Sequence, residues 1–158
     1  MSTNRISAMF DSMVDNILLK SAEKIANDAR ASAPTQRIKA NINVSAVENT
    51  SQGKQIRVYV PLEDAPEARA YELGSGIHGA EHATYPIEAK NVPNLVFFWE
   101  KADRYFVGPR VDHPGVAARP YLFPAVAKNK NTILGLLSRG LGALIRTSVT
   151  AGFREKTK

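Results

Sequence analysis

The chain has no cysteine among its 158 residues, which excludes disulfide bonds and thiolate chemistry. It also has no run close to the ~20 apolar residues that cross a bilayer, and its first residues lack the apolar core of a signal peptide. We therefore expect a protein that neither spans a membrane nor is exported by that route. Because its length and 44% hydrophobic content suit one core, we expect residues 1–158 to form a single domain.

Catalytic signatures are equally scarce. The sequence has no Gly-rich phosphate loop, no zinc-finger spacing and no serine nucleophile elbow. Residues 78–82 (His-Gly-Ala-Glu-His) match the H-x-x-E-H pattern of inverted zinc peptidases, which requires both histidines on one face of a stable helix. Gly76, Gly79 and Pro86 disfavour such a helix. We predict no catalytic residue, no cofactor and no metal beyond an adventitious contact, and hence that the chain is not an enzyme.

The net charge of +6 comes from 21 basic and 15 acidic residues. Much of the excess lies between Lys128 and Lys158, where Glu155 is the only acid. Such residues usually solvate the outer face of a helix and a frayed tail, and the alternative is a surface that faces DNA. The candidate DNA-facing residues are Lys128, Lys130, Arg139, Arg146 and Arg154.

Two long amphipathic helices are predicted at the ends of the chain. Apolar residues recur at three- and four-residue steps over residues 6–33, and Pro34 ends that segment. A stripe of Ile and Leu predicts a second helix over residues 120–146, followed by a basic tail at 147–158. Gly135, Gly140 and Gly142 each cost about 1 kcal/mol inside a helix, so they indicate either close backbone packing or a bend.

Between these helices the apolar pattern changes to a period of two. Alternation over residues 38–46 and a second extended run at 55–60 predict a hairpin, with Gly53 in its turn. Residues 64–73 then predict a short helix, with Asp64 as a candidate cap and Gly74 as its end.

The second half of the sheet region begins with a glycine- and histidine-rich loop. We expect the loop, at 76–94, to project from the sheet, and strands at 85–88 and 95–99 to pair before a further strand at 104–111. The predicted fold class is α+β. A mostly antiparallel sheet of four to five strands within residues 38–111 packs against the long N-terminal and C-terminal helices.

Residues 96–99 (Val-Phe-Phe-Trp) are apolar on both faces of a strand. Such a run is either covered on both sides within the protomer, or buries one face and presents the other to another subunit. Neighbouring aromatics could also stack on nucleic-acid bases, although at strand spacing they are more often core. The aromatics concerned are Phe97, Phe98, Trp99, Tyr105 and Phe106.

Four prolines within residues 107–126 exclude a regular helix or central strand through that stretch. His113, Pro114 and Gly115 predict a tight turn, in which proline presets one corner and glycine takes a positive φ. The turn redirects the chain toward residues 119–125 (Arg-Pro-Tyr-Leu-Phe-Pro-Ala), where two aromatics precede the last helix. We expect this segment to clamp the start of that helix to a core.

The chain resembles a family of phage virion proteins in three successive features. These are the Val- and Phe-rich strand, the His-Pro-Gly turn and the Arg-Pro-aromatic segment. The family is that of the tail-completion, or head-to-tail joining, proteins of long-tailed double-stranded DNA bacteriophages. Ala-Pro-Thr at 33–35 and Tyr-Glu-Leu-Gly-Ser at 71–75 agree with the same family, so the resemblance covers most of the chain. Gln36 departs from it, because relatives often carry glycine there.

The resemblance implies a structural virion protein of the neck or tail end, made in the host bacterial cytoplasm. It implies a ring of about six copies that contacts connector, tail terminator or tail tube proteins and lets double-stranded DNA pass during genome ejection. The expected subunit or partner contacts are Gly76, Ile77, His78, His82, Tyr85, Val92, Phe97 and Trp99. The alternative function is a small nucleic-acid-binding module that uses the basic C-terminal segment.

Overall fold

The computed structural model describes the backbone of residues 3–99 and 102–155, and the side chains of residues 6–99 and 102–147. The fold is α+β, as predicted, with long N-terminal and C-terminal helices and small antiparallel sheets. The chain divides into two compact units. A helical unit consists of Met1–Ala65 and Tyr121–Lys158, and a β-rich unit consists of Pro66–Pro120. The single domain expected from the length stays a prediction.

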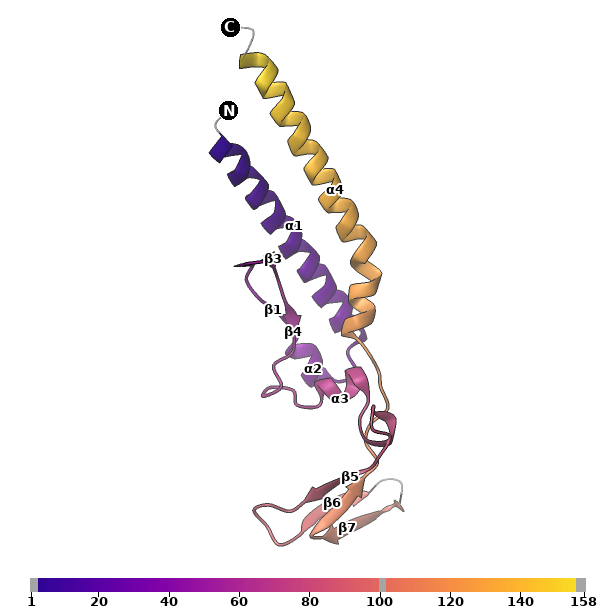
Figure 1. The fold of residues 1–158 in the computed structure, drawn as a ribbon. Coiled ribbons are helices and arrows are strands. Elements are labelled where there is room, and N and C mark those ends of the chain that lie inside the picture. The colour runs from indigo at the N-terminus through magenta and orange to yellow at the C-terminus, as the bar shows by residue number, and fades with distance from the viewer. Residues whose placement is uncertain (1–2, 100–101, 156–158) are drawn as a thin grey trace. The chain divides into compact units, whose positions relative to one another are not determined.

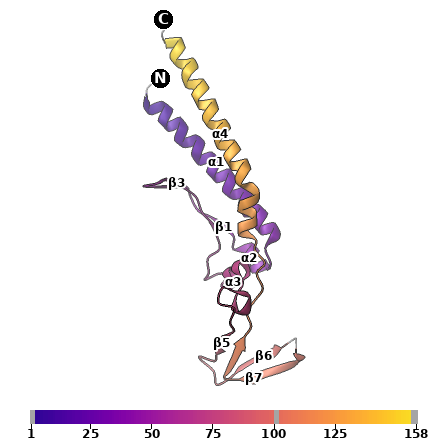
Figure 2. The same cartoon turned by 45° about the vertical axis from the view of Figure 1, so that its right-hand side comes forward.

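Helices α1 (Thr3–Ser32) and α4 (Leu122–Glu155) lie side by side in the helical unit (Figures 1 and 2). The N-terminal helix was predicted nearly to its bounds. The C-terminal helix is longer than predicted, because residues 147–155 of the expected tail continue it. No proline follows Pro124 in the sequence, so every later backbone N–H remains available as a helical donor.

Gly140 shows that at least one of the helical glycines serves close packing. A Cβ built on Gly140 would lie 2.6 Å from the sulfur of Met13 and 3.2 Å from Cδ1 of Ile17, both on α1. A side chain at residue 140 would require the Met13 side chain to shift, so Gly140 allows α1 and α4 to pack closely here.

A polar cluster links α1 to α4 at the other end of their contact. The amide of Asn129, buried on α4, donates to Asp28 Oδ2 at 2.6 Å and to the Ala125 carbonyl at 2.9 Å. Lys128 Nζ lies 2.9 Å from Asp28 Oδ1, and Lys24 Nζ lies 3.6 Å from Oδ2. The hydrogen bond from Asn129, followed by that from Lys128, lowers the pKa of Asp28 from 3.8 to about 2.

The lowered pKa of Asp28 predicts a defined acid sensitivity. Because the carboxylate is favoured in the folded state, its stabilising contribution is present above the unfolded pKa and is lost as pH falls from about 4 to about 2. We expect Asp28→Asn to melt at a lower temperature than the parent at neutral pH, with the two melting temperatures converging over that acidic range. Thermal denaturation followed by circular dichroism at several pH values checks this. A constant difference in melting temperature across the range would contradict it.

The first predicted strand, residues 38–46, is wrong in its first half. Residues Gln36–Ala40 form the short helix α2, whose N-cap Thr35 accepts a hydrogen bond from the Ile38 amide at 3.1 Å. Ile38 and Ile42 are both fully buried. They are four residues apart, a spacing that fits a helical turn as well as an alternating strand, which explains the error.

The remaining strands of the helical unit form two short antiparallel pairs. Strand β1 (Asn43–Val44) pairs with β4 (Val58–Tyr59), and β2 (Glu48–Thr50) pairs with β3 (Gly53–Gln55). The predicted pairing is present in β1 and β4, but the expected connecting stretch forms the β2–β3 pair, and Gly53, with a φ of +123°, opens β3 after the turn at residues 51–52. Lys54, on this hairpin, donates to Asp15 of α1 at 2.8 Å and so fastens the hairpin to the helix.

The β-rich unit opens with helix α3 (Ala68–Leu73) and the 3₁₀ turn η1 (Gly76–His78). Gly74 ends α3 with a φ of +78°, as predicted. The helix starts later than expected, and its N-cap position is held by Glu67 rather than by Asp64. Pro61 carbonyl accepts the Asp64 and Ala65 amides, which gives residues 61–65 a turn of their own before α3.

The strand pairing of this unit differs from the prediction. Strand β5 (Tyr85–Glu88) pairs with β8 (Arg110–His113), and β6 (Leu95–Trp99) pairs with β7 (Arg104–Gly108). The expected pairing of β5 with β6 is therefore wrong, and the predicted strand 104–111 is divided at Pro109, which has no N–H to donate. The described strands form four two-stranded sheets rather than one sheet of four to five strands.

Candidate functional site

Two segments of the β-rich unit cross and are joined through their backbones. The Ser75 amide donates to the Val116 carbonyl at 2.9 Å, and the Ile77 amide donates to the Pro114 carbonyl at 2.8 Å. Val116 N in turn donates to Ser75 Oγ at 3.0 Å. We call this the glycine crossing, because Gly76 and Gly115 lie at its centre. Two of the motifs that resemble the phage family, at 71–75 and 113–115, thus meet in space.

The glycine crossing depends on the absence of side chains at its centre. Gly115 has a φ of +90° and Gly76 a φ of +62°. A Cβ on Gly115 would lie 1.9 Å from the Ser75 carbonyl oxygen, and one on Gly76 would lie 2.2 Å from the Pro114 carbonyl oxygen. His113 Nδ1 accepts the Gly115 amide at 2.9 Å and closes the turn. The predicted turn is confirmed, and it also holds the crossing segments together.

The histidines of the H-x-x-E-H match do not share a helix. His78 ends the η1 turn, whereas His82 has a φ of +51° and its Nδ1 lies 3.3 Å from the Ile77 carbonyl oxygen. Among the residues that the structure describes, no group of three or more His, Asp or Glu side chains could hold a metal ion. The absence of a catalytic metal stays a prediction, and the geometry of residues 78–82 lacks the helix that such a site requires.

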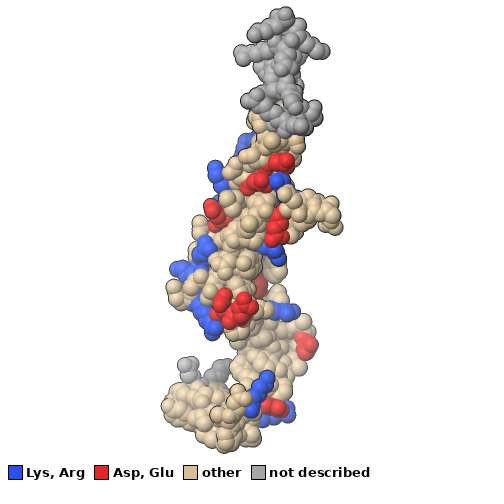
Figure 3. All heavy atoms as spheres, turned by 90° about the vertical axis from the view of Figure 1, so that its left-hand side faces the viewer, with Lys and Arg blue, Asp and Glu red and all other residues tan. Residues whose placement is uncertain are grey.

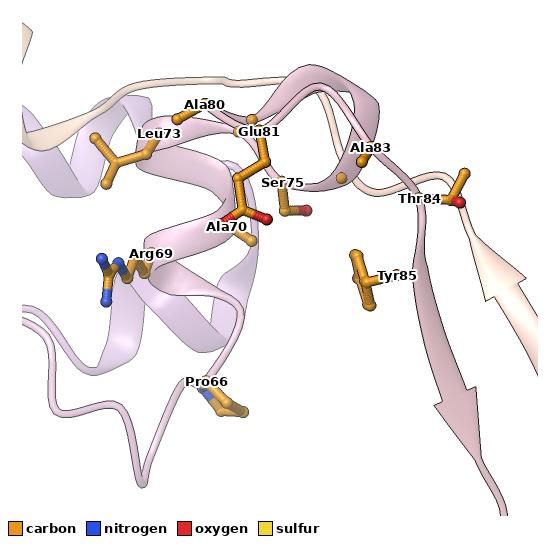
Figure 4. Close-up of a pocket in the computed structure, with 13 residues that line it drawn as sticks. Pro66, Arg69, Ala70, Leu73, Ser75, Ala80, Glu81, Ala83, Thr84 and Tyr85 are labelled. Atoms are coloured by element: carbon orange, nitrogen blue, oxygen red, sulfur yellow. The ribbon is translucent and has the colours of Figure 1, made fainter.

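The loop that leads to β5 borders an open pocket of about 680 Å³ (Figure 4). Arg69 of α3 and Glu81 of the loop supply its charged side chains, and Tyr85 lies across from α3. The volume suits a small ligand, but one cation and one anion among small side chains do not select a chemical class. The other lining residues are Pro66, Ala70, Leu73, Gly74, Ser75, Gly76, Gly79, Ala80, Ala83 and Thr84.

The β6–β7 hairpin exposes an apolar surface. The register places Val96 opposite Val107 and Phe98 opposite Tyr105, so these four side chains share one face. Their exposed fractions lie between 48% and 69%, and the rings of Phe98 and Tyr105 meet edge to face with centroids 5.4 Å apart. We call these four residues the hairpin patch. All four side chains of residues 96–99 are at least 38% exposed, so the strand is not buried on both faces.

The opposite face of the same hairpin is better covered. Phe97 stacks on Phe106 with ring centroids 5.2 Å apart, and Phe97 and Trp99 are less exposed than the hairpin patch. The predicted contact residues Phe97 and Trp99 thus lie on the better-covered face, whereas Val96 and Phe98 of the same predicted contact strand lie in the hairpin patch. The alternation of Val96 and Phe98 was a usable signal, but which strand lies beside them, and in which register, was not readable locally.

The other predicted contact residues are spread along the same unit. Ile77 and Val92 are exposed apolar residues of the loop, and Tyr85 begins β5, with its ring centroid 5.3 Å from that of His113. The β5–β8 pair carries charged side chains of its own, since Arg110 lies 3.7 Å from Glu88 and 3.3 Å from Asp112. The hairpin patch consists of uncharged side chains, whereas the loop also carries Glu81 and Lys90.

The candidate DNA-facing residues do not form one patch. Lys128 is paired with Asp28, and Arg139 and Arg146 follow it on the same side of α4, because eleven and seven residues are close to whole helical turns. Lys130, two residues after Lys128, lies on a different side of the helix. The view in Figure 3 shows basic and acidic side chains intermixed over the helical unit. The side chain of Arg154 lies outside the described residues.

Comparisons with family models, curated proteins and solved structures found no significant match to this chain. The resemblance to phage joining proteins therefore depends on the residues themselves and remains a hypothesis. Within the described part of the chain, no helix is long and apolar enough to cross a bilayer.

Proposed function

We propose that this chain is a structural subunit of the neck or tail end of a long-tailed bacteriophage, which assembles with copies of itself into a ring between head connector and tail tube. The ring would contain about six copies and let double-stranded DNA pass. Its direct partners would be the connector, tail terminator or tail tube proteins. In this role the chain works by positioning surfaces and has no reaction to catalyse.

The observation that carries this proposal is the exposed hairpin patch. Four large apolar side chains on one face of a two-stranded hairpin are costly to leave in water, and an isolated two-stranded hairpin is itself marginally stable. Contact with another protein would remove both costs. A subunit whose exposed apolar side chains become buried on assembly suits a joint between virion components.

The glycine crossing gives further support. It joins the two family-like motifs by backbone hydrogen bonds that leave no room for a Cβ at Gly76 or Gly115. Such a junction sets the direction in which the chain leaves toward the β5–β8 and β6–β7 pairs. A subunit that must present a surface to a neighbour at a fixed angle benefits from this kind of junction.

The test of the proposal is made in assembled phage particles that contain this chain. We expect about six copies around an axial channel wide enough for duplex DNA, with contacts that include the loop at 76–94 or the β6 strand. Val107→Asp should reduce the yield of joined particles by at least about a hundredfold, because an unpaired carboxylate buried at a contact costs several kcal/mol.

Gln52→Asp is the matched control, because Gln52 is exposed in the β2–β3 turn and already polar. It should leave the particle yield close to that of the parent. A single copy or a two-fold dimer in the particle would remove the proposal, as would an interface without either segment. Steeply salt-dependent binding of the isolated protein to DNA, together with absence from particles, would favour the nucleic-acid-binding alternative instead.

A further inference from the structure

The side chain of His113 accepts a hydrogen bond that only an imidazole with an unprotonated Nδ1 can accept. Its Nδ1 lies 2.9 Å from the Gly115 amide nitrogen, and a backbone N–H can only donate. The proton of the neutral ring is therefore on Nε2. The bond spans two residues, as in the turns that Asn and Asp side chains form with their own backbone.

Protonation of the His113 imidazole would convert this acceptor into a donor. The charged ring carries a hydrogen on both nitrogens, so the Nδ1–H and the Gly115 N–H would point at each other across 2.9 Å. Either the ring rotates and leaves the part-buried Gly115 amide without its acceptor, or the turn itself opens. Both changes weaken the turn at residues 113–115.

The turn is linked to the glycine crossing on both sides of Gly115. The Pro114 carbonyl accepts the Ile77 amide at 2.8 Å, and the Val116 carbonyl accepts the Ser75 amide at 2.9 Å. Between them, Gly115 lies so close to Ser75 that an added Cβ would be 1.9 Å from the carbonyl oxygen. A shift of Gly115 therefore disturbs both flanking hydrogen bonds.

We infer that His113 is a pH-sensitive switch of the glycine crossing, which the neutral ring stabilises and the charged ring destabilises. Histidine is the side chain that ordinarily changes its charge between pH 5 and 8. Because the hydrogen bond requires the neutral ring, its stabilising contribution is present above that range and is lost as pH falls through it. The inference does not depend on the proposed function, since it concerns the fold of one chain.

The groups around His113 do not hold its charged form. The residue opposite it on β5 is Tyr85, whose ring attracts cations only weakly because the side chain is 39% exposed. The charged residues of the β5–β8 pair, Glu88, Arg110 and Asp112, interact with one another. Among the described residues, no carboxylate forms an ion pair with His113. Carboxylates and phenols also ordinarily titrate outside pH 5 to 8.

The other two histidines of the chain differ from His113 in what their rings do. His82 Nδ1 lies 3.3 Å from the Ile77 carbonyl oxygen, which can only accept, so protonation of the His82 ring preserves this contact. His78 ends the η1 turn, and no described residue is hydrogen-bonded to its ring. Of the three, only His113 has a contact that protonation removes.

Hydrogen exchange of the full-length protein at pH 8, 6.5 and 5 tests the inference. Protection factors are compared, because they correct for the intrinsic dependence of exchange on pH. We expect protection of the Ser75 and Ile77 amides to fall about tenfold from pH 8 to pH 5, as loss of one part-buried hydrogen bond implies. The Lys39 amide, which donates to the Thr35 carbonyl in the helical unit, should keep its protection.

His113→Asn separates the hydrogen bond from the charge. The Asn side-chain oxygen can accept from the amide two residues on but does not titrate, so this variant should keep its pH 8 protection at pH 5. His113→Leu has no acceptor, and its protection should be as low at pH 8 as that of the parent at pH 5. His78→Asn and His82→Gln are the matched controls, and both should retain the tenfold change.

Three results would overturn the inference. These are constant protection in the parent from pH 8 to pH 5, a pH-dependent loss that persists in His113→Asn, and a loss that disappears in either control variant. Nitrogen-15 spectroscopy of the parent adds a check that needs no substitution, because it shows which ring nitrogen carries the proton. At pH 8 the proton of His113 should be on Nε2, and a proton on Nδ1 would also overturn the inference.

Discussion

Gly115→Ala should lower the free energy of unfolding of the β-rich unit by about 3 kcal/mol. Two effects add. The residue has a φ of +90°, which strains any side chain, and the new Cβ would meet the Ser75 carbonyl oxygen at 1.9 Å. Since both partners are backbone, relief requires the crossing segments to separate. Hydrogen exchange at the Ser75, Ile77 and Val116 amides measures the effect, because these amides donate across or beside the crossing.

Gly53→Ala is the control for backbone strain alone. Gly53 also has a positive φ, of +123°, but nothing lies within 4 Å of a Cβ built there. We expect that substitution to cost about 1 kcal/mol. If Gly115→Ala costs no more than Gly53→Ala, the close crossing of residues 75–76 and 114–115 is not present in the folded protein.

Tyr121→Ala should lower the free energy of unfolding of the helical unit by about 3 to 5 kcal/mol. Tyr121 is only 2% exposed and lies just before α4, where Ala125 is buried one turn later. Removing its ring deletes a large buried surface and leaves a cavity that rigid helices fill poorly. Urea denaturation followed by circular dichroism at the helical band gives the value, and Tyr121→Phe should recover most of the loss.

Phe123→Ala is the matched control for Tyr121→Ala within the same motif. Phe123 is 64% exposed, so its truncation should change the free energy of unfolding by less than about 1 kcal/mol. Equal losses of stability at residues 121 and 123 would contradict the placement of Tyr121 as the clamp of α4.

Tyr121 and Phe123 show which features the local sequence could predict and which it could not. The prolines and aromatics of residues 119–125 correctly predicted the start of the last helix against a core. They did not predict which aromatic is buried, since both stand beside proline in similar surroundings. Orientation around α4 is set by the contact with α1, through Asn129, Asp28 and Gly140. That contact joins residues about a hundred positions apart, beyond any local pattern.

In the candidate site, too, some features were predictable from local sequence and others were not. The positive φ of Gly115 was predictable from the His-Pro-Gly turn, but the Ser75 backbone that makes a side chain impossible there was not. The apolar character of β6 was evident in the sequence, whereas its pairing with β7, and hence the hairpin patch, was decided by tertiary structure.

The sequence by itself determined the α+β class, the first helix, the glycine turns and the positions of strands β5 and β6. Those features follow from local backbone preferences and from periodicity, which the chain carries residue by residue. Only the tertiary structure decided that residues 36–40 are helical, that β5 pairs with β8, and which apolar side chains remain exposed. A period of two or of 3.6 records which residues share a face, but it does not record what covers that face. That depends on which distant segments meet.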